Sequence, residues 1–259
     1  MISLSIADGI AEIVLDAPHK LNSLDEQALR DLAQAYDDAA AAASGGEVRA
    51  LLLRGEGRAF CAGRDIAGVT PETDDVQAYL GGLLQPLLKK MSAFPAPTFA
   101  AAQGACLGVG LGLLLATDVV YVAENAKFGS PFANLGATLD SGGHWYFTER
   151  LGMHRTLDLI YTAELMSGAD AVAQGMFSRA MPAGDLLENT RAIVAKAATG
   201  ATGAFNASKE LVAHIRDQRL GLWESMEEEN SEQARLCKTE DYSEGFLAFQ
   251  EKRKPVFKG

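Results

Sequence analysis

The segment VRALLLRGEGRAFCAGRDI, residues 48–66, joins a short apolar run to a loop rich in glycine and other small residues. Its first part, residues 48–53, is typical of a strand that is buried on both faces. Similar apolar runs at residues 98–103 and 118–122 predict two more buried strands. Because helical patterns alternate with these runs, we predict parallel strands connected by helices, which is an α/β fold.

Helices are predicted on both sides of the segment. Ser23 and Glu26 form a capping box ahead of helically spaced apolar residues, so we predict a helix from residue 24 to about residue 43. A second helix is predicted over residues 75–91. Near the N-terminus, Asp8-Gly9 separates two apolar stretches and predicts a hairpin.

From residue 153 onward the pattern is almost wholly helical, with one extended break at residues 177–181. The main helical candidates are residues 186–198, 205–215, 220–236 and 243–253. This change of pattern divides the chain into a core of residues 1–200 and a C-terminal helical region of residues 201–259. We expect the C-terminal region to pack on the core or on a neighbouring subunit.

Composition narrows the classes of function. The chain has 259 residues and a net charge of −11, so it lacks the basic excess of a general nucleic-acid or anionic-membrane binder. Any anionic ligand must be held by a local cluster of donors. Three cysteines without a C-x-x-C pair suit a reducing compartment and no structural metal site. The first residues lack the features of a signal peptide, and we expect a cytoplasmic protein.

Several catalytic motifs are absent. The glycines of residues 104–112, GACLGVGLG, match neither the G-x-G-x-x-G dinucleotide fingerprint nor the Walker pattern. The chain has no G-x-S-x-G nucleophile elbow, and its four histidines show no metal-ligand spacing. Two loops remain, residues 57–66 and 104–112, each after a buried strand. Such loops meet at one end of a parallel sheet, and their backbone N–H groups can together stabilise an oxyanion.

These loops also carry a specific resemblance. Together with LNSL at residues 21–24, KFGSP at residues 127–131 and the tail FQEKRKPVF at residues 249–257, they resemble the crotonase, or enoyl-CoA hydratase/isomerase, superfamily. The resemblance covers nearly the whole chain. It implies a crotonase-type ββα spiral core with a C-terminal helical trimerisation region, hence a homotrimer or a dimer of trimers. It also implies an acyl-CoA substrate, with no cofactor besides the coenzyme A carried by that substrate.

The resemblance assigns the oxyanion hole to the backbone N–H groups of Arg64 and Val109, which would stabilise the enolate of a thioester. Hydratases of the superfamily carry two glutamates, and this chain has Gly112 and Phe132 at those positions. Adding water to a double bond requires one group to deprotonate water and another to protonate carbon. A standard hydratase reaction is therefore not expected.

Asp140, in the sequence LDSGG at residues 139–143, matches the aspartate of the superfamily's single-acid isomerases. One carboxylate can remove a proton from one carbon and return it to another, so we predict that Asp140 is the catalytic acid/base. The alternative is that Asp140 only caps the helix that follows it.

The resemblance places Lys20, Ala62, Asp65 and Ile66 near coenzyme A, with Phe257 and Lys258 reaching it from an adjacent subunit. Cations are needed near the phosphates of coenzyme A. The alternative is that the basic residues near the C-terminus are only solvated.

A second group of residues could line an acyl pocket: Phe132, Leu139, His144 and Trp145. An apolar Phe132 in place of a carboxylate would make this pocket drier and raise the pKa of Asp140. The chain is therefore predicted to be an acyl-CoA isomerase. A catalytically silent acyl-CoA-binding protein and an atypical enoyl-CoA hydratase are the alternatives.

Overall fold

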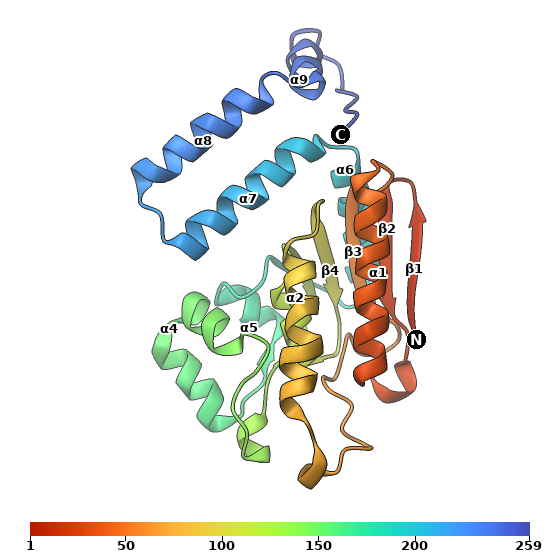
Figure 1. Cartoon of the computed structure of the whole chain (residues 1–259), viewed down its shortest axis with the longest axis vertical. Coiled ribbons are helices and arrows are strands. Elements are labelled where there is room, and N and C mark those ends of the chain that lie inside the picture. The colour runs from red at the N-terminus through yellow and green to blue at the C-terminus, as the bar shows by residue number, and fades with distance from the viewer.

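The computed structural model describes residues 1–259, and a six-stranded sheet forms its centre (Figure 1). The strand order is β1-β2-β3-β4-β6-β9. The first two strands pair antiparallel, and each later neighbour pairs in parallel. The strands span Ile2–Ala7 (β1), Ile10–Leu15 (β2), Ala50–Gly55 (β3), Thr98–Ala102 (β4), Val119–Ala123 (β6) and Arg179–Met181 (β9). The predicted α/β fold with parallel buried strands is confirmed, as is the hairpin at Asp8-Gly9.

A second, three-stranded sheet lies beyond the carboxyl end of β4. It consists of β5 (Ala105–Leu107), β7 (Lys127–Gly129) and β8 (Met166–Ser167), in the order β5-β7-β8. An isolated parallel bridge between Cys61 and Cys106 connects the loop after β3 to β5. This bridge brings together the two glycine-rich loops that the sequence singled out.

The helices surround the sheets. They are α1 (Glu26–Ser44), α2 (Gln85–Ser92), α3 (Val109–Leu115), α4 (Gly143–Thr162), α5 (Gly168–Ala173), α6 (Leu186–Ala198), α7 (Thr202–Gln218), α8 (Leu222–Leu236) and α9 (Glu240–Gln250). A π-helical turn, Ala78–Leu84, leads directly into α2. In Figure 1, α1 and α2 cover one face of the large sheet and α6 lies behind it. All four helices predicted after residue 186 are present, α6 with the predicted bounds.

One detail of the helix prediction was wrong. The N-cap of α1 is Asp25, whose carboxylate accepts a hydrogen bond from Ala28 N–H at 2.8 Å, and not Ser23. Leu24 lies in a backbone bridge to Arg64, so the chain is still extended there and the helix begins later. Asp25 is an equally good capping residue.

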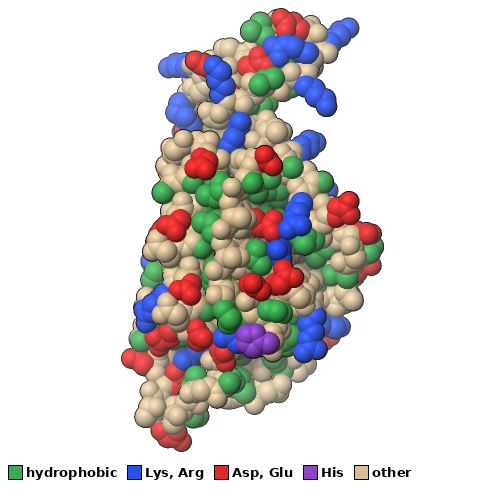
Figure 2. Space-filling view, turned by 90° about the vertical axis from the view of Figure 1, so that its right-hand side faces the viewer, with side chains coloured by type: hydrophobic (Ala, Val, Ile, Leu, Met, Phe, Trp, Pro, Cys, Tyr) green, Lys and Arg blue, Asp and Glu red, His purple; other side chains and the backbone are tan.

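The C-terminal helices α7, α8 and α9 project from the core in Figure 1. Several of their apolar side chains are open to solvent, including Trp223 and Phe249, which are 72% and 84% exposed. In Figure 2 basic side chains are prominent on the upper part of the surface, at this end of the molecule. No helix of the chain is both long enough and apolar enough to cross a bilayer. The division at residue 200 stays a prediction.

Candidate active site

The first candidate oxyanion donor, the backbone N–H of Arg64, is oriented by Leu24. Leu24 N–H donates to Gly63 C=O at 2.9 Å, and Asp65 N–H donates to Leu24 C=O at 2.9 Å. Because the C=O and N–H of a trans peptide point in opposite directions, this bridge turns the Arg64 N–H away from Leu24. The Arg64 N–H has no hydrogen-bond acceptor within the chain. It is therefore available to a ligand.

The second candidate donor, Val109 N–H, belongs to the first residue of α3. N–H groups in the first turn of a helix have no partner inside that helix, and this one has no other acceptor in the chain. The preceding Gly108 has a φ of 50° and ψ of −119°, a conformation that glycine adopts without strain. This glycine lets the chain turn sharply from β5 into α3.

The two donors lie on adjacent backbone segments. Cys61 N–H donates to Ala105 C=O at 3.0 Å, and Leu107 N–H donates to Cys61 C=O at 3.0 Å. A Cβ built on Gly63 would lie 3.0 Å from the Leu107 carbonyl oxygen, so only glycine fits there unless the neighbouring backbone shifts. The structure thus brings the Arg64 and Val109 segments side by side, and neither N–H has an acceptor in the chain.

The positions of the two missing glutamates are filled by other groups. A Cβ on Gly112 would lie 2.3 Å from the Ser141 Cβ, so the loop that carries Asp140 packs directly on α3. At the second position, the Phe132 ring covers Gly108, with its Cζ 3.0 Å from where a Cβ would be. At position 112 a side chain does not fit without movement of Ser141, and at position 132 the phenylalanine ring occupies the space.

Asp140 lies in the turn before α4, and it does not cap that helix. The N-cap of α4 is Gly142, and no side chain caps it. Instead, the Asp140 carboxylate accepts a hydrogen bond from the Ser141 hydroxyl at 2.7 Å. Burial raises the pKa of Asp140 above its usual value, while the Ser141 hydrogen bond and the charge of Arg64 act in the opposite direction. The cap-only alternative is therefore not supported.

The Arg64 side chain is fixed beside the site. Its guanidinium makes two hydrogen bonds to the Asp74 carboxylate, at 2.6 and 2.7 Å. It also lies over the Tyr79 ring, 4.2 Å from the ring centre. The Tyr79 hydroxyl in turn donates to Leu24 C=O at 2.8 Å. The predicted role of Arg64 involves only its main chain, but its side chain also brings a positive charge close enough to affect Asp140.

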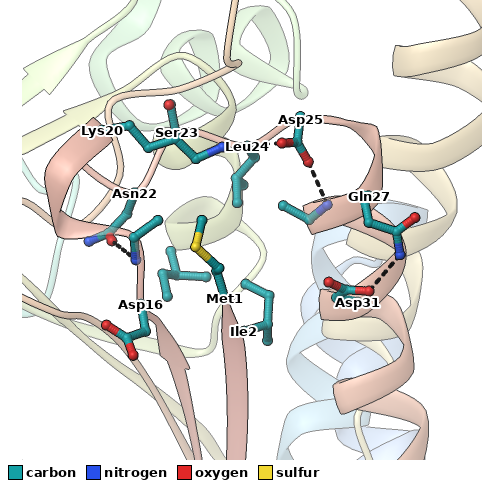
Figure 3. A pocket seen from close by; sticks show the side chains of 13 residues that line it. Met1, Ile2, Asp16, Lys20, Asn22, Ser23, Leu24, Asp25, Gln27 and Asp31 are labelled. Carbon is teal, nitrogen blue, oxygen red and sulfur yellow. Dashed lines mark hydrogen bonds and ion pairs between the residues drawn. The ribbon is translucent and has the colours of Figure 1, made fainter.

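Asn22 is a structural residue that the sequence analysis left without a role. It is buried, and its side chain accepts from Ala17 N–H at 2.7 Å (Figure 3). The same side chain donates to Glu56 C=O and Ala59 C=O at 3.0 and 2.8 Å. Its φ of 58° lies in the left-handed region, which asparagine tolerates better than most residues. Asn22 is part of the LNSL motif, but the motif does not show which backbone groups its side chain binds.

Four residues expected near coenzyme A are clustered. Lys20 forms ion pairs with Asp65 at 2.8 Å and Asp25 at 3.1 Å, and Ala62 N–H donates to Leu21 C=O. Ile66, next to Asp65, is exposed. The Lys20 ammonium is thus shared by two carboxylates, and the hydrogen bond to Asp65 raises its pKa. A small cavity of about 120 Å³, drawn in Figure 3, lies beside this turn.

Phe257 and Lys258 lie elsewhere in the same chain. Phe257 C=O accepts from Arg49, the residue before β3, and Lys258 pairs with Glu240 of α9 at 2.8 Å. Arg64 follows the other end of β3, and Val109 follows β5, which the Cys61–Cys106 bridge joins to the loop after β3. Phe257 and Lys258 therefore do not reach the two donors within one subunit. Their predicted contribution from an adjacent subunit remains a prediction.

The four residues predicted to line an acyl pocket do not line one common cavity in this structure. Phe132 faces Gly108, but Leu139 is buried against Gly143. His144 is exposed and contacts the Thr138 hydroxyl, with 3.1 Å between its Nε2 and the oxygen. Trp145 is 40% exposed and lies beside Arg216 of α7.

A larger cavity next to the Asp140 turn has a different lining. It measures about 690 Å³ and extends from Gly112 and Ser141 between α2 and α7. Sequence reasoning missed this wall because α7 follows α4 by some 40 residues in the chain, and nothing in either pattern showed that they meet.

Comparisons with known proteins agree with this geometry. The model of the enoyl-CoA hydratase/isomerase family matches residues 5–259. A Rhodobacter capsulatus protein named "Probable enoyl-CoA hydratase" is 34% identical, over 100% of this chain and 98% of that protein. The 1,2-epoxyphenylacetyl-CoA isomerase of Escherichia coli is 28% identical, over 98% of this chain and 97% of the isomerase.

The fold agrees as well. The crystal structure of an enoyl-CoA hydratase from Bacillus anthracis superimposes with a TM-score of 0.90 and 29% identity, covering 100% of this chain and 99% of that one. This similarity confirms the predicted crotonase-type fold. Because the family model and the relatives span nearly the entire chain, the protein belongs to the enoyl-CoA hydratase/isomerase family.

Proposed function

We propose that the protein is an acyl-CoA isomerase that moves a double bond, or carries out a related isomerisation, with Asp140 as its single acid/base. The observation that carries the proposal is the combination of two free N–H donors with one partly buried carboxylate, while Gly112 and Phe132 occupy the positions of the hydratase glutamates. The similarity to an epoxyphenylacetyl-CoA isomerase supports it.

In the proposed reaction, the thioester oxygen of a 3-enoyl-CoA accepts hydrogen bonds from Arg64 N–H and Val109 N–H. The Asp140 carboxylate removes a proton from C2, and the electron pair of that C–H bond delocalises onto the thioester oxygen. The hole stabilises this enolate, and one such donor is typically worth about 10²–10³ in rate. The protonated Asp140 then returns the proton to C4, which leaves the double bond between C2 and C3. A base whose pKa is raised by burial is well matched to this proton transfer.

The experiment is to follow the conversion of 3-hexenoyl-CoA to 2-hexenoyl-CoA by the near-ultraviolet absorbance of the conjugated product. We expect Asp140→Asn to reduce kcat by at least about 10³ and to leave acyl-CoA affinity nearly unchanged. Ser141→Ala is the matched control, because it keeps the carboxylate and removes only one hydrogen bond. Full activity of Asp140→Asn would reject the proposal.

An enoyl-CoA hydratase without the two glutamates is the second candidate, because most of the named relatives are hydratases. It would convert 2-hexenoyl-CoA to a product heavier by one water. A silent acyl-CoA binder would bind both thioesters and convert neither. Product analysis by mass spectrometry therefore separates all three possibilities.

The proposed assembly is a homotrimer or a dimer of trimers, built through the C-terminal helices. The support is the exposed apolar surface of these helices, including Val212, Leu222 and Trp223, which are 65%, 68% and 72% exposed. Large exposed apolar areas mark interfaces between proteins. Within such an assembly, Phe257 and Lys258 would approach the coenzyme A bound to a neighbouring subunit.

A further inference from the structure

The peptide that links Gly63 to Arg64 is contacted by a buried thiol. Cys61 Sγ accepts a hydrogen bond from Gly63 N–H at 3.4 Å and lies 3.8 Å from Gly63 C=O, to which the thiol donates. The same carbonyl accepts from Leu24 N–H at 2.9 Å. Gly63 C=O and Arg64 N–H belong to one peptide plane. Any group that fixes the direction of this carbonyl therefore also fixes the direction of the first candidate oxyanion donor.

The thiol also touches the segment that carries the second donor. Cys61 is fully buried, and a Cβ built on Gly110 would lie 2.9 Å from its Sγ and 2.7 Å from its Cβ. Gly110 directly follows Val109 in the first turn of α3. The Cys61 side chain is thus in close contact with α3. Through its bond to Gly63 C=O it also contacts the Gly63–Arg64 peptide, and through its bond from Gly63 N–H the peptide before it.

We propose that Cys61 is a positioning residue for the oxyanion hole. Its hydrogen bonds hold the two peptides that flank the Gly63 Cα, and so set the tilt of the Gly63–Arg64 peptide. Its volume sets the distance between that peptide and the first turn of α3. This inference rests on the proposed function, because it assumes that the two N–H groups bind a thioester oxygen.

The requirement for such a residue follows from the local backbone. Gly63 has a φ of 103°, a conformation available to glycine, and glycine has more conformational freedom than any other residue. A donor after such a residue needs external contacts to hold its direction, and small errors in position at an active site are costly in rate. Burial raises the pKa of Cys61 to about 12, so the thiol stays protonated and can donate at neutral pH.

Cys106 provides a matched control. It is also fully buried, it pairs with Cys61 across the backbone bridge, and its Sγ lies 3.7 Å from both Gln103 C=O and Gly104 C=O. It makes no hydrogen bond to Gly63 or Arg64. Replacing either cysteine with alanine removes the same volume from the interior, but only Cys61→Ala removes contacts to the hole.

The test measures polarisation of a bound thioester carbonyl together with kinetics. Cinnamoyl-CoA is the probe, since its absorbance moves to longer wavelength when the carbonyl is hydrogen-bonded. We expect Cys61→Ala to lower kcat about tenfold with KM within about twofold, and to lose most of the wavelength shift. Cys61→Ser, which keeps a donor and acceptor, should recover at least half of the shift. Cys106→Ala should resemble the wild type in both measurements.

The proposal is overturned if Cys61→Ala retains the wild-type shift and kcat, if Cys106→Ala loses as much as Cys61→Ala, or if the serine variant is no better than alanine. In those cases the wild type still shows the shift, and the proposed function stands. A wild-type protein that binds cinnamoyl-CoA without any shift would instead refute the oxyanion hole itself. Circular dichroism and the Kd for cinnamoyl-CoA verify that each variant is folded.

Discussion

The pKa of Asp140 depends on its burial and on the nearby side chain of Arg64. Burial raises the pKa of Asp140, and the positive charge of Arg64 opposes that effect. Arg64 is itself held by Asp74 and by the Tyr79 ring. The side chain of Arg64 and its main-chain N–H thus have separate candidate roles, and a substitution can change one without removing the other.

Arg64→Met is expected to move the acidic limb of the pH profile of kcat/KM to higher pH. The proposed base, Asp140, acts when deprotonated, so activity should be lost as the pH falls through its pKa. Removing a nearby positive charge raises that pKa further, while the N–H donor remains. The measurement is kcat/KM for 3-hexenoyl-CoA as a function of pH. Arg30→Met, on the exposed surface of α1, is the control and should leave the profile unchanged. A shift to lower pH would contradict the assignment.

Gly112→Ala is expected to reduce kcat by about tenfold or more, because its Cβ would lie 2.3 Å from the Ser141 Cβ and displace the loop that carries Asp140. Gly82→Ala is the matched control, since a Cβ there meets no atom within 4 Å. Steady-state kinetics and the acyl-CoA Kd distinguish displacement of the base from loss of binding. Equal effects of the two substitutions on kcat would show that the contact between Gly112 and Ser141 does not position Asp140.

At the scale of elements, the turn between β2 and α1 supports the loop after β3. The Asn22 side chain bonds to the backbone of its own turn, at Ala17, and to the backbone of the loop after β3. Leu24 forms the bridge to Arg64. The sequence predicted the strands and the helices, because periodicity is a local signal. The two main-chain donors were assigned from the family resemblance, and their role stays a prediction. The sequence did not predict which face of α4 points toward the site. His144 and Trp145 were therefore placed in the pocket, although α7 packs near Trp145 and His144 faces solvent.

Asn22→Ala is expected to destabilise the protein by about 2–4 kcal/mol, because three backbone groups lose their partner and alanine fits a φ of 58° poorly. Urea unfolding at one fixed protein concentration measures this loss. Gln34→Ala, which removes an exposed hydrogen bond to Asp38, is the control and should cost under about 0.5 kcal/mol. Similar values for the two variants would refute the supporting role of Asn22.

At the scale of the whole molecule, α7–α9 extend from the core and leave apolar side chains uncovered (Figure 1). The local sequence pattern identified these helices correctly. It did not place the last residues, since the Phe257 carbonyl is held by Arg49, about 200 residues earlier in the chain. A contact between such distant segments leaves no local signal in the sequence.

Introducing charge on this apolar surface is expected to dissociate the assembly. The double substitution Val212→Glu and Trp223→Glu should yield monomers by light scattering, because it places carboxylates where apolar surfaces would meet. Tyr161→Glu, on α4 and 75% exposed, is the control and should leave the mass unchanged. A wild-type protein that is already monomeric would rule out the proposed trimer.

Both candidate donors for the thioester oxygen are main-chain groups, and this has a consequence for divergence among related proteins. Mutation can alter the side chains at positions 64 and 109 while the N–H groups are retained. Under the proposed mechanism, a lineage can lose acids at positions 112 and 132 and use one at position 140 without changing the backbone that binds the thioester carbonyl. New reactions can then arise when the acid/base side chain moves to another position while the two N–H donors stay in place.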